Sequence, residues 1–448
     1  MQQDLTRGNL FRAMMRFSIP YLIASFLQTF YGLADLFITG RFCGVESVTA
    51  VSVGSQVMHM ITVIIVGLAM GTTVTISYAV GRGERKSVPG LIGNTIVVFA
   101  IMAALMTAGL LLGLSGILQL LQVPEESLAP AHSYLLICFA GIPFITAYNV
   151  LSSIFRGLGD TRTPMIFVAI AGVINVGLDI LLIGPMGFGA AGAAAATVIS
   201  QALSVLMAAA AFQKVSGGIR LSRRDFHCSR PQAGKILSIG VPIACQDGLI
   251  QVSFLIITAI ADSRGVTIAA AVGVVEKLIS FFFLVPSAML STVSAVASQN
   301  AGAGRHDRSR QALHYGIAVG VIFGLAIFLL CQFIPDRLVS PFVSGDAEVV
   351  RYGSQYLRSY SFDCVVAAVH FCFSGYFCAY EKSVYSFLHN VISIFTVRIP
   401  LAWAASVYFP DNLFPMGLAS PAGSAMSVIL CLLFYEFGFR RKRKENAV

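Results

Sequence analysis

The segment AGVINVGLDILLI, residues 171–183, carries the signal that decides the fold of this chain. It is almost entirely apolar and has no proline, yet it holds Asn175 and Asp179 four residues apart. On a helix this spacing places both side chains on one face, one turn apart. A carboxylate is costly inside a membrane and persists mainly where it faces a cavity, a cation or a partner. The segment therefore predicts a membrane helix with a functional polar face.

The next apolar stretch contributes a third polar group, Thr197. The connection between the two stretches, residues 184–189, is so short that the two helices must run antiparallel, which returns Thr197 to about the depth of Asp179. Amide, carboxylate and hydroxyl oxygens together suit a small hard cation or a proton. The alternative is a buried polar cluster that only holds helices together.

The composition indicates an integral membrane protein. Of 448 residues, 56% are hydrophobic and 11% charged, and the mean hydropathy is +0.80. Apolar runs of about 20 residues, the length that crosses a bilayer, recur from end to end and leave no room for a soluble domain. The nine cysteines form no CxxC pair, which argues against a zinc site or a disulfide framework. The first apolar run lacks a cleavage site and is interpreted as a retained helix.

The charge pattern predicts the orientation of the chain. The net charge of +9 comes from basic residues in the loops between apolar runs, such as Arg82, Arg156 and Arg308, which argues against nucleic-acid binding. The alternate loops carry acids instead. By the positive-inside rule, both termini are expected in the cytoplasm. The expected spans are residues 14–39, 48–72, 91–121, 132–156, 163–184, 189–213, 236–261, 268–298, 312–338, 350–379, 384–409 and 415–438.

The chain also repeats itself. The Gly-Arg-Gly sequence at residues 81–83, after the second span, has a counterpart in Gly-Ala-Gly at residues 302–304, after the eighth. Pro20 and Pro242 lie early in the first and seventh spans. These matches predict an all-α membrane fold of twelve helices in two pseudo-symmetric lobes around a central cleft, with substrate held between them. The lobes are residues 1–213 and 236–448, the second with a basic cytoplasmic tail, and 214–235 is a cytoplasmic inter-lobe loop.

The first span carries a second polar stripe. Gln28, Tyr31 and Asp35 share a helix face and are expected to point into the bundle. Pro20 lacks an N–H and crowds the preceding turn, so it is able to bend this helix and move Asp35. The alternative is a static kink with Asp35 as a capping residue at the outer helix end.

At these residues the chain resembles the MATE (multidrug and toxic compound extrusion) family over essentially its full length. The resemblance rests on FYGLADLFITG in the first span, the glycine-rich turn after the second, FRGLGDTRTP at residues 155–164, NVGLD at residues 175–179, GAAGAAAATVISQ and RIPLAW. Each motif is weak by itself, but their order across twelve spans is specific. Where FRGLGDTRTP is expected to recur in the second half, the chain has FCAYEK at residues 377–382.

The resemblance implies a prokaryotic plasma-membrane antiporter that exports amphipathic, often cationic drugs against inward proton or sodium flow. It implies no enzymatic activity and no cofactor, and a functional monomer is expected because both lobes lie in one chain. It also implies a bending role for Pro20 and a cation or proton site, with Na⁺ as a candidate ion, formed by Asp35, Asn149, Asn175, Asp179 and Thr197. Candidate substrate-lining residues are Gln28, Tyr31, Asp247, Gln251, Glu276 and Asp363.

The candidates in the second half have structural alternatives. Asp247 and Gln251 share a helix face and suit either drug contact or a tie between helices. Glu276 is followed by Lys277, which neutralises it in part. Asp363 is expected to pair with Arg398 across helices more readily than to bind substrate. Some members of the family place a Glu and an Asp in this half, but Glu276 and Asp363 are only approximate counterparts, so we do not transfer a second ion site to it.

Three other functions fit the sequence less well. A lipid-linked oligosaccharide flippase shares the two-lobe plan but needs a cationic cavity for pyrophosphate, whereas acids are more evident than arginines in these spans. A membrane-embedded prenyl transferase needs paired acidic clusters that hold Mg²⁺, and no DDxxD-like run occurs. A receptor or scaffold is disfavoured because no sizeable extramembrane domain is evident.

Overall fold

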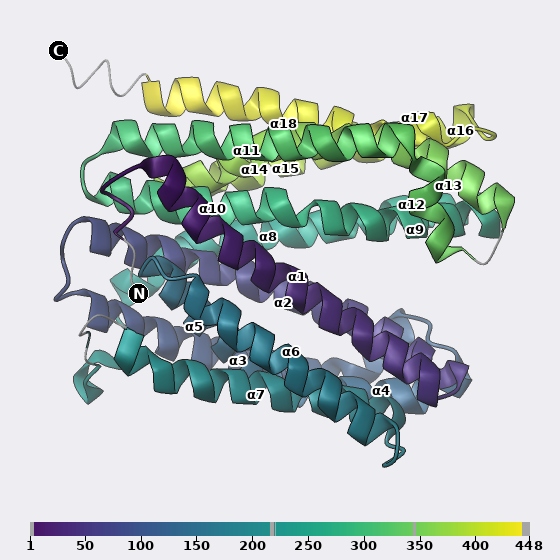
Figure 1. The fold of residues 1–448 in the computed structure, drawn as a ribbon, viewed down its shortest axis with the longest axis horizontal. Helices are drawn as coiled ribbons and strands as arrows, with labels where there is room; N and C mark the ends of the chain where they lie inside the picture. The colour runs from purple at the N-terminus through teal and green to yellow at the C-terminus, as the bar shows by residue number, and fades with distance from the viewer. Residues whose placement is uncertain (1–3, 216–218, 220, 344–345, 441–448) are drawn as a thin grey trace. The chain divides into compact units, whose positions relative to one another are not determined.

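The structure is a computed structural model that describes residues 4–215, 219, 221–343 and 346–440, and these residues form helices and turns with no strand among them (Figure 1). The chain divides into two compact units, Met1–Gly240 and Val241–Val448, which are described separately. The division lies inside α8 (Arg230–Asp262), a few residues beyond the predicted inter-lobe loop 214–235. Part of that loop, residues 216–218 and 220, and the basic tail, residues 441–448, lie outside the described residues.

Among its described residues, the first unit contains seven long or medium helices, a 3₁₀ turn η1 (Arg223–Asp225) and the start of α8. The helices are α1 (Leu10–Phe42), α2 (Val45–Gly81), α3 (Val88–Leu120), α4 (Glu125–Ala140), α5 (Ile142–Gly157), α6 (Arg162–Ile183) and α7 (Gly189–Val215).

The second unit begins within α8 and ends in a π-helical turn, η4 (Glu436–Arg440). Its elements are α9 (Val266–Phe282), α10 (Leu284–Gly302), α11 (His306–Phe333), α12 (Pro335–Val339), η2 (Ser340–Phe342), α13 (Ala347–Tyr360), α14 (Asp363–Ala379), α15 (Ser383–Ser393), the π-helical turn η3 (Ile394–Arg398), α16 (Ile399–Tyr408), α17 (Phe414–Gly417) and α18 (Ala419–Tyr435).

Ten helical segments of the described chain are long and apolar enough to cross a membrane, and two bent pairs bring the total to twelve. The pairs are α4 with α5, bent by 47°, and α13 with α14, bent by 42°. They correspond to the predicted fourth and tenth spans. Between α4 and α5, Pro143 follows Gly141 and has no N–H to continue the helical hydrogen bonds. The predicted all-helical membrane fold with twelve spans is therefore confirmed.

The same backbone turn ends equivalent helices in both units. After α2, Gly83 has a φ of 74° and the next N–H, of Glu84, donates to the Ala79 carbonyl at 3.1 Å. After α10, Gly304 has a φ of 72° and the N–H of Arg305 donates to the Asn300 carbonyl at 2.8 Å. A left-handed residue at this position is the usual way to close a helix, and glycine adopts it without a steric penalty.

The turn also recurs where the sequence motif does not. After α5, Gly159 has a φ of 84°, and at the corresponding place after α14, Glu381 has a φ of 59°. In both turns the N–H of the following residue, Asp160 or Lys382, donates back across the turn at 2.8 Å. A side chain in the left-handed region costs about 1–2 kcal/mol. The second unit therefore keeps the geometry of the first at this turn although the glycine is lost.

A single stripe of α6 is buried, and it contains the two polar residues that the sequence singled out. The buried positions follow one face at helical spacing and are Pro164, Val168, Ala171, Asn175, Asp179 and Ile183. This face packs against α1 and α7 (Figure 1). Val173, on another face of the helix, is 76% exposed, as expected for a lipid-facing position. The polar groups of α6 therefore point at its two neighbours.

Candidate ion-coupling site

Four of the predicted site residues lie together in the first unit. Thr197 of α7 donates a hydrogen bond from its Oγ1 to Oδ2 of Asp35 on α1 at 3.2 Å. Asn175 and Asp179 of α6 lie beside Asp35, close enough for their side chains to interact with its carboxylate. The exposed fractions are 4% for Asp35, 1% for Asn175 and 0% for Asp179. We refer to these four residues as the carboxylate cluster.

The carboxylate cluster is rich in unused hydrogen-bonding atoms. Oδ1 of Asp35, both oxygens of Asp179, and the oxygen and nitrogen of the Asn175 amide have no hydrogen-bond partner among the described residues. No lysine or arginine of the described chain forms an ion pair with either carboxylate. Two adjacent carboxylates repel strongly where water is excluded, and a proton or a bound cation removes that repulsion. The chemistry of the cluster therefore fits a proton or a small hard cation.

Tyr31 connects the carboxylate cluster to the rest of α1. Its hydroxyl accepts a hydrogen bond from Nε2 of Gln201 at 3.2 Å and lies close enough to Asp35 and Tyr148 for electrostatic interaction. Gln201 was not among the predicted residues. Its place near the site was nevertheless visible in the sequence. Gln201 follows Thr197 by four residues in an apolar run, which places it one turn farther along the same face of α7.

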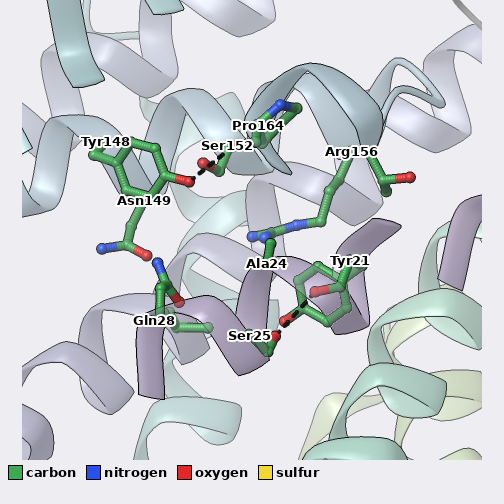
Figure 2. Close-up of a pocket in the computed structure, with 11 residues that line it drawn as sticks. Tyr21, Ala24, Ser25, Gln28, Tyr148, Asn149, Ser152, Arg156 and Pro164 are labelled. Carbon is green, nitrogen blue, oxygen red and sulfur yellow. Dashed lines mark hydrogen bonds between the residues drawn. The ribbon is translucent and has the colours of Figure 1, made fainter. Parts of the chain in front are cut away.

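Asn149 and Gln28 lie in a separate pocket of the first unit. Figure 2 shows their amide groups on one side of this pocket, with Arg156 entering it from α5. The Nδ2 of Asn149 donates to the Ile145 carbonyl at 2.8 Å, and no interaction with Asp35 is described for it. Because Tyr148 also lines the pocket, Tyr31 interacts with residues of both sites. The structure thus places Asn149 in the lining of the pocket, and its described hydrogen bond is to the Ile145 carbonyl.

Arg156 is a residue whose environment the sequence did not reveal. Its position after the predicted fourth span suggested an exposed loop charge, but it occupies the last turn of α5 and is only 8% exposed. Its guanidinium lies over the Tyr21 ring, 5.1 Å from the ring centroid, and its Nη2 donates to Ser153 Oγ at 2.6 Å. A basic residue at a helix end is common, so sequence alone gave no signal that this one lines a pocket.

Pro20 lies inside α1 and is buried. The helix runs through it without interruption from Leu10 to Phe42. Proline cannot donate to the carbonyl one turn earlier, so the helix is weakened at this point. Nearby, Thr161 donates a side-chain hydrogen bond to the Phe17 carbonyl at 2.8 Å, which ties the start of α1 to the turn after α5.

The acids of the second unit have nearby polar groups. Glu276 accepts a hydrogen bond from Thr258 Oγ1 at 2.9 Å. Asp363 and Arg398 interact electrostatically, but no ion pair within 4 Å joins them in the described chain. Arg398 instead donates from Nη2 to the Tyr360 hydroxyl at 2.8 Å. Asp363 and Arg398 are therefore electrostatic neighbours, as expected, without a direct ion pair.

Asp247 and Gln251 lie on α8 in the second unit, and both are half-buried. The carboxylate of Asp247 accepts from Nε2 of its neighbour Gln246 at 3.3 Å. No hydrogen bond is described for the Gln251 side chain. Across the described residues, no group of three or more His, Cys, Asp or Glu side chains is arranged to hold a metal ion.

Comparison with known proteins places this geometry in a family. The sequence model of the MatE family matches the chain twice, at residues 20–181 and 242–404. This chain belongs to the MatE family. It is therefore a multi-pass membrane transporter and not an enzyme, in agreement with the resemblance of its motifs. The double match also agrees with the internal repeat, because each half of the chain carries one copy.

Relatives span almost the whole chain. The "Probable multidrug resistance protein YoeA" of Bacillus subtilis is 25% identical over 449 residues, which cover 98% of this chain and 96% of the relative. The "FAD transporter" of Shewanella oneidensis is 25% identical and covers 94% of this chain and 93% of its own length. A solved structure titled "Outward-facing conformation of a multidrug resistance MATE family transporter of the MOP superfamily" has a TM-score of 0.90, 22% identity and 98% coverage of both chains. The MatE match and these named relatives support a multidrug efflux transporter of small molecules.

Counting positions within the two family matches gives apolar residues in the second half where the first half has Asp35 and Asp179. Counted from the start of the second match, the position equivalent to Asp35 is Ile257, and counted back from its end, the equivalent of Asp179 is Ala402. Ile257 and Ala402 are fully buried apolar residues.

Proposed function

We propose that this MatE-family chain is a secondary-active exporter of amphipathic, often cationic drugs, driven by inward flow of protons or sodium ions through the carboxylate cluster. The observation that carries the proposal is the pair Asp35 and Asp179, buried side by side with three of their four carboxylate oxygens unpartnered among the described residues. A membrane protein retains such a pair at a large energetic cost, and ion translocation is the function that uses it.

Ion binding changes the energetics of α1 in this proposal. When the cluster is empty, repulsion between Asp35 and Asp179 favours their separation, whereas a proton or a cation holds them together. Asp35 lies on the far side of Pro20 from the N-terminus, so α1 is able to respond at its weakened turn. The ion thereby favours one of two conformations of the transporter, and the drug favours the other. Coupling follows from this difference in affinity, and alternating access exchanges drug for ion.

The first span also provides the connection between ion and drug. Tyr31 interacts with Asp35 of the cluster and with Tyr148 of the pocket that Gln28 and Asn149 line. A shift of α1 therefore alters both sites together. We further propose a prokaryotic plasma-membrane location with both termini in the cytoplasm, based on the basic loops, and a functional monomer.

The test neutralises each carboxylate in turn. Asp35→Asn and Asp179→Asn are each expected to abolish ion-driven drug efflux from reconstituted vesicles while the protein reaches the membrane in normal amounts. Drug-stimulated proton and sodium fluxes are measured with each gradient imposed separately, which also identifies the coupling ion.

Glu46→Gln is the matched control, because Glu46 is an exposed acid at the start of α2 in the same unit. It removes one carboxylate without touching the cluster and is expected to transport normally. Wild-type efflux and ion flux in both cluster variants would contradict the proposed coupling site.

A further inference from the structure

The pocket shown in Figure 2 has an unexpected charge for a site that meets cationic drugs. Of the residues that line it, all within the described chain, Arg156 is the one charged side chain, and no aspartate or glutamate is among them. The remaining lining is mainly hydroxyl and amide groups, including Ser25, Gln28, Asn149 and Ser152. The net charge presented to a ligand is therefore positive.

The positive charge is not neutralised by a neighbour. No ion pair joins Arg156 to a carboxylate in the described part of the chain. Its Nε is buried without a hydrogen-bond acceptor, and the described bond from the guanidinium goes to the neutral Ser153 hydroxyl. The face of Tyr21 stabilises the cation in part, but an aromatic ring does not replace a carboxylate. A buried cation without a counter-ion is unfavourable unless a ligand provides one.

A second polar group of the pocket lies on the same helix as Arg156. Ser152 lies one turn before Arg156 on α5, is 5% exposed, and has a hydroxyl that interacts with the neutral side chain of Tyr148 and with no charged group. It lines the same pocket. A hydroxyl and a guanidinium on one helix face form a pair of donors that matches the oxygens of an acidic group.

We propose that this pocket binds the acidic group of an organic anion or zwitterion, with Arg156 as the fixed counter-ion and Ser152 as a second donor. The acidic group is a carboxylate or a phosphate. This inference rests on the proposed export function and extends its substrate class from cationic compounds to amphiphiles that carry an acidic group.

The experiment compares two dyes that differ only at the acid. Rhodamine 110 carries a carboxyl group, and rhodamine 123 is its methyl ester with the same cationic ring system. Binding of each dye to the purified full-length protein is measured by fluorescence polarisation. We expect the wild type to prefer the acid, and Arg156→Gln to reduce that preference at least about tenfold, the usual effect of losing a charge-assisted hydrogen bond. Arg156→Lys is expected to recover part of the preference, since it keeps the charge but not the planar pair of donors.

A second variant guards against a folding defect in the Arg156 variants. Gln28→Glu introduces a negative charge on α1 at the opposite side of the pocket, where the described structure gives the Gln28 amide no hydrogen bond to lose. It is expected to lower the preference for rhodamine 110 as well. Two results would overturn the inference: a wild-type protein without preference for the acid, or equal losses for both dyes in both variants.

The same samples separate this inference from the proposed coupling mechanism. In Asp35→Asn the preference for the acid is expected to persist in the binding assay, because Asp35 does not line the pocket, while ion-driven transport is lost. Intact transport in Asp35→Asn with a normal acid preference would overturn the coupling site and leave the anion pocket standing. If the preference for rhodamine 110 is lost only in Arg156→Gln and Gln28→Glu, the result supports binding of the acidic group in this pocket, whichever ion drives transport.

Discussion

The hydrogen bond between Thr197 and Asp35 gives the most quantitative prediction. Hydrogen bonds to charged groups contribute about 1.5–3 kcal/mol. At 3.2 Å this bond is longer than the usual range of about 2.5–3.0 Å for O–H···O hydrogen bonds. We therefore take the lower value of about 1.5 kcal/mol, which corresponds to about a tenfold change in an equilibrium constant. Thr197→Val keeps the branched shape of the side chain and removes the hydroxyl. Thr197→Ser keeps the hydroxyl and is the matched control.

The sign of the effect depends on which ion is coupled. In a proton-coupled transporter, the Thr197 hydroxyl stabilises the ionised form of Asp35. In the Thr197→Val variant Asp35 therefore holds a proton more readily, and the midpoint of the pH dependence of efflux rises by about one pH unit. In a sodium-coupled transporter, the variant loses an oxygen ligand, and the half-saturating Na⁺ concentration rises about tenfold.

The assay is drug efflux from reconstituted vesicles over a range of pH at fixed Na⁺, and over a range of Na⁺ at fixed pH. Thr197→Ser is expected to follow the wild type within about twofold on both axes, since it retains the donor. The reasoning is refuted if the efflux curves of Thr197→Val and Thr197→Ser coincide in both the pH and the Na⁺ titration. That result would mean that the hydroxyl contributes nothing to ion binding.

Two further predictions concern stability and are read from the thermal unfolding midpoint of the purified protein. A Cβ at Gly71 on α2 would overlap the backbone carbonyl oxygen of Ile236 on α8, so Gly71→Ala is expected to destabilise the folded protein by about 1–3 kcal/mol. The control is Gly90→Ala, whose Cβ meets nothing within 4 Å and which is expected to leave the midpoint unchanged or higher. Equal midpoints for the two variants would show that the contact at Gly71 relaxes freely. Tyr360→Phe removes the acceptor of the Arg398 Nη2 hydrogen bond and leaves a buried donor unsatisfied, at an expected cost of about 1–3 kcal/mol of stability. An unchanged unfolding midpoint would mean that another acceptor replaces the Tyr360 hydroxyl.

The sequence predicted the membrane fold well because hydropathy acts locally. A run of apolar residues of sufficient length must form a helix in lipid, where every backbone N–H and C=O needs a partner within its own segment. The same locality allowed Asn175 and Asp179 to be placed on one helix face, and the buried stripe of α6 includes both. Two spans are nonetheless bent pairs, at α4–α5 and α13–α14, and hydropathy alone represented each as one straight run.

The sequence was less informative about which polar groups meet. Asn149 is in the pocket with Gln28, although its motif suggested the ion site, because the turn of α5 that carries it faces the first half of α1. Arg156 was counted as a loop charge, since a basic residue at the end of a span usually lies in water. Its burial against Tyr21 depends on how α5 packs on α1, which no local pattern encodes.

By itself, the sequence determined that this chain lies in a membrane, that its helices repeat in two halves, and that a few acids occupy places where lipid would exclude them. These properties follow from hydrophobic length, from periodicity and from the cost of a charge in hydrocarbon, all of which act along one helix. Tertiary structure decided that Asp35 meets Asp179 and Thr197, and that Arg156 stands in a pocket without a counter-ion. Such encounters depend on the packing of helices distant in sequence, and the energy of a charge depends on everything that surrounds it.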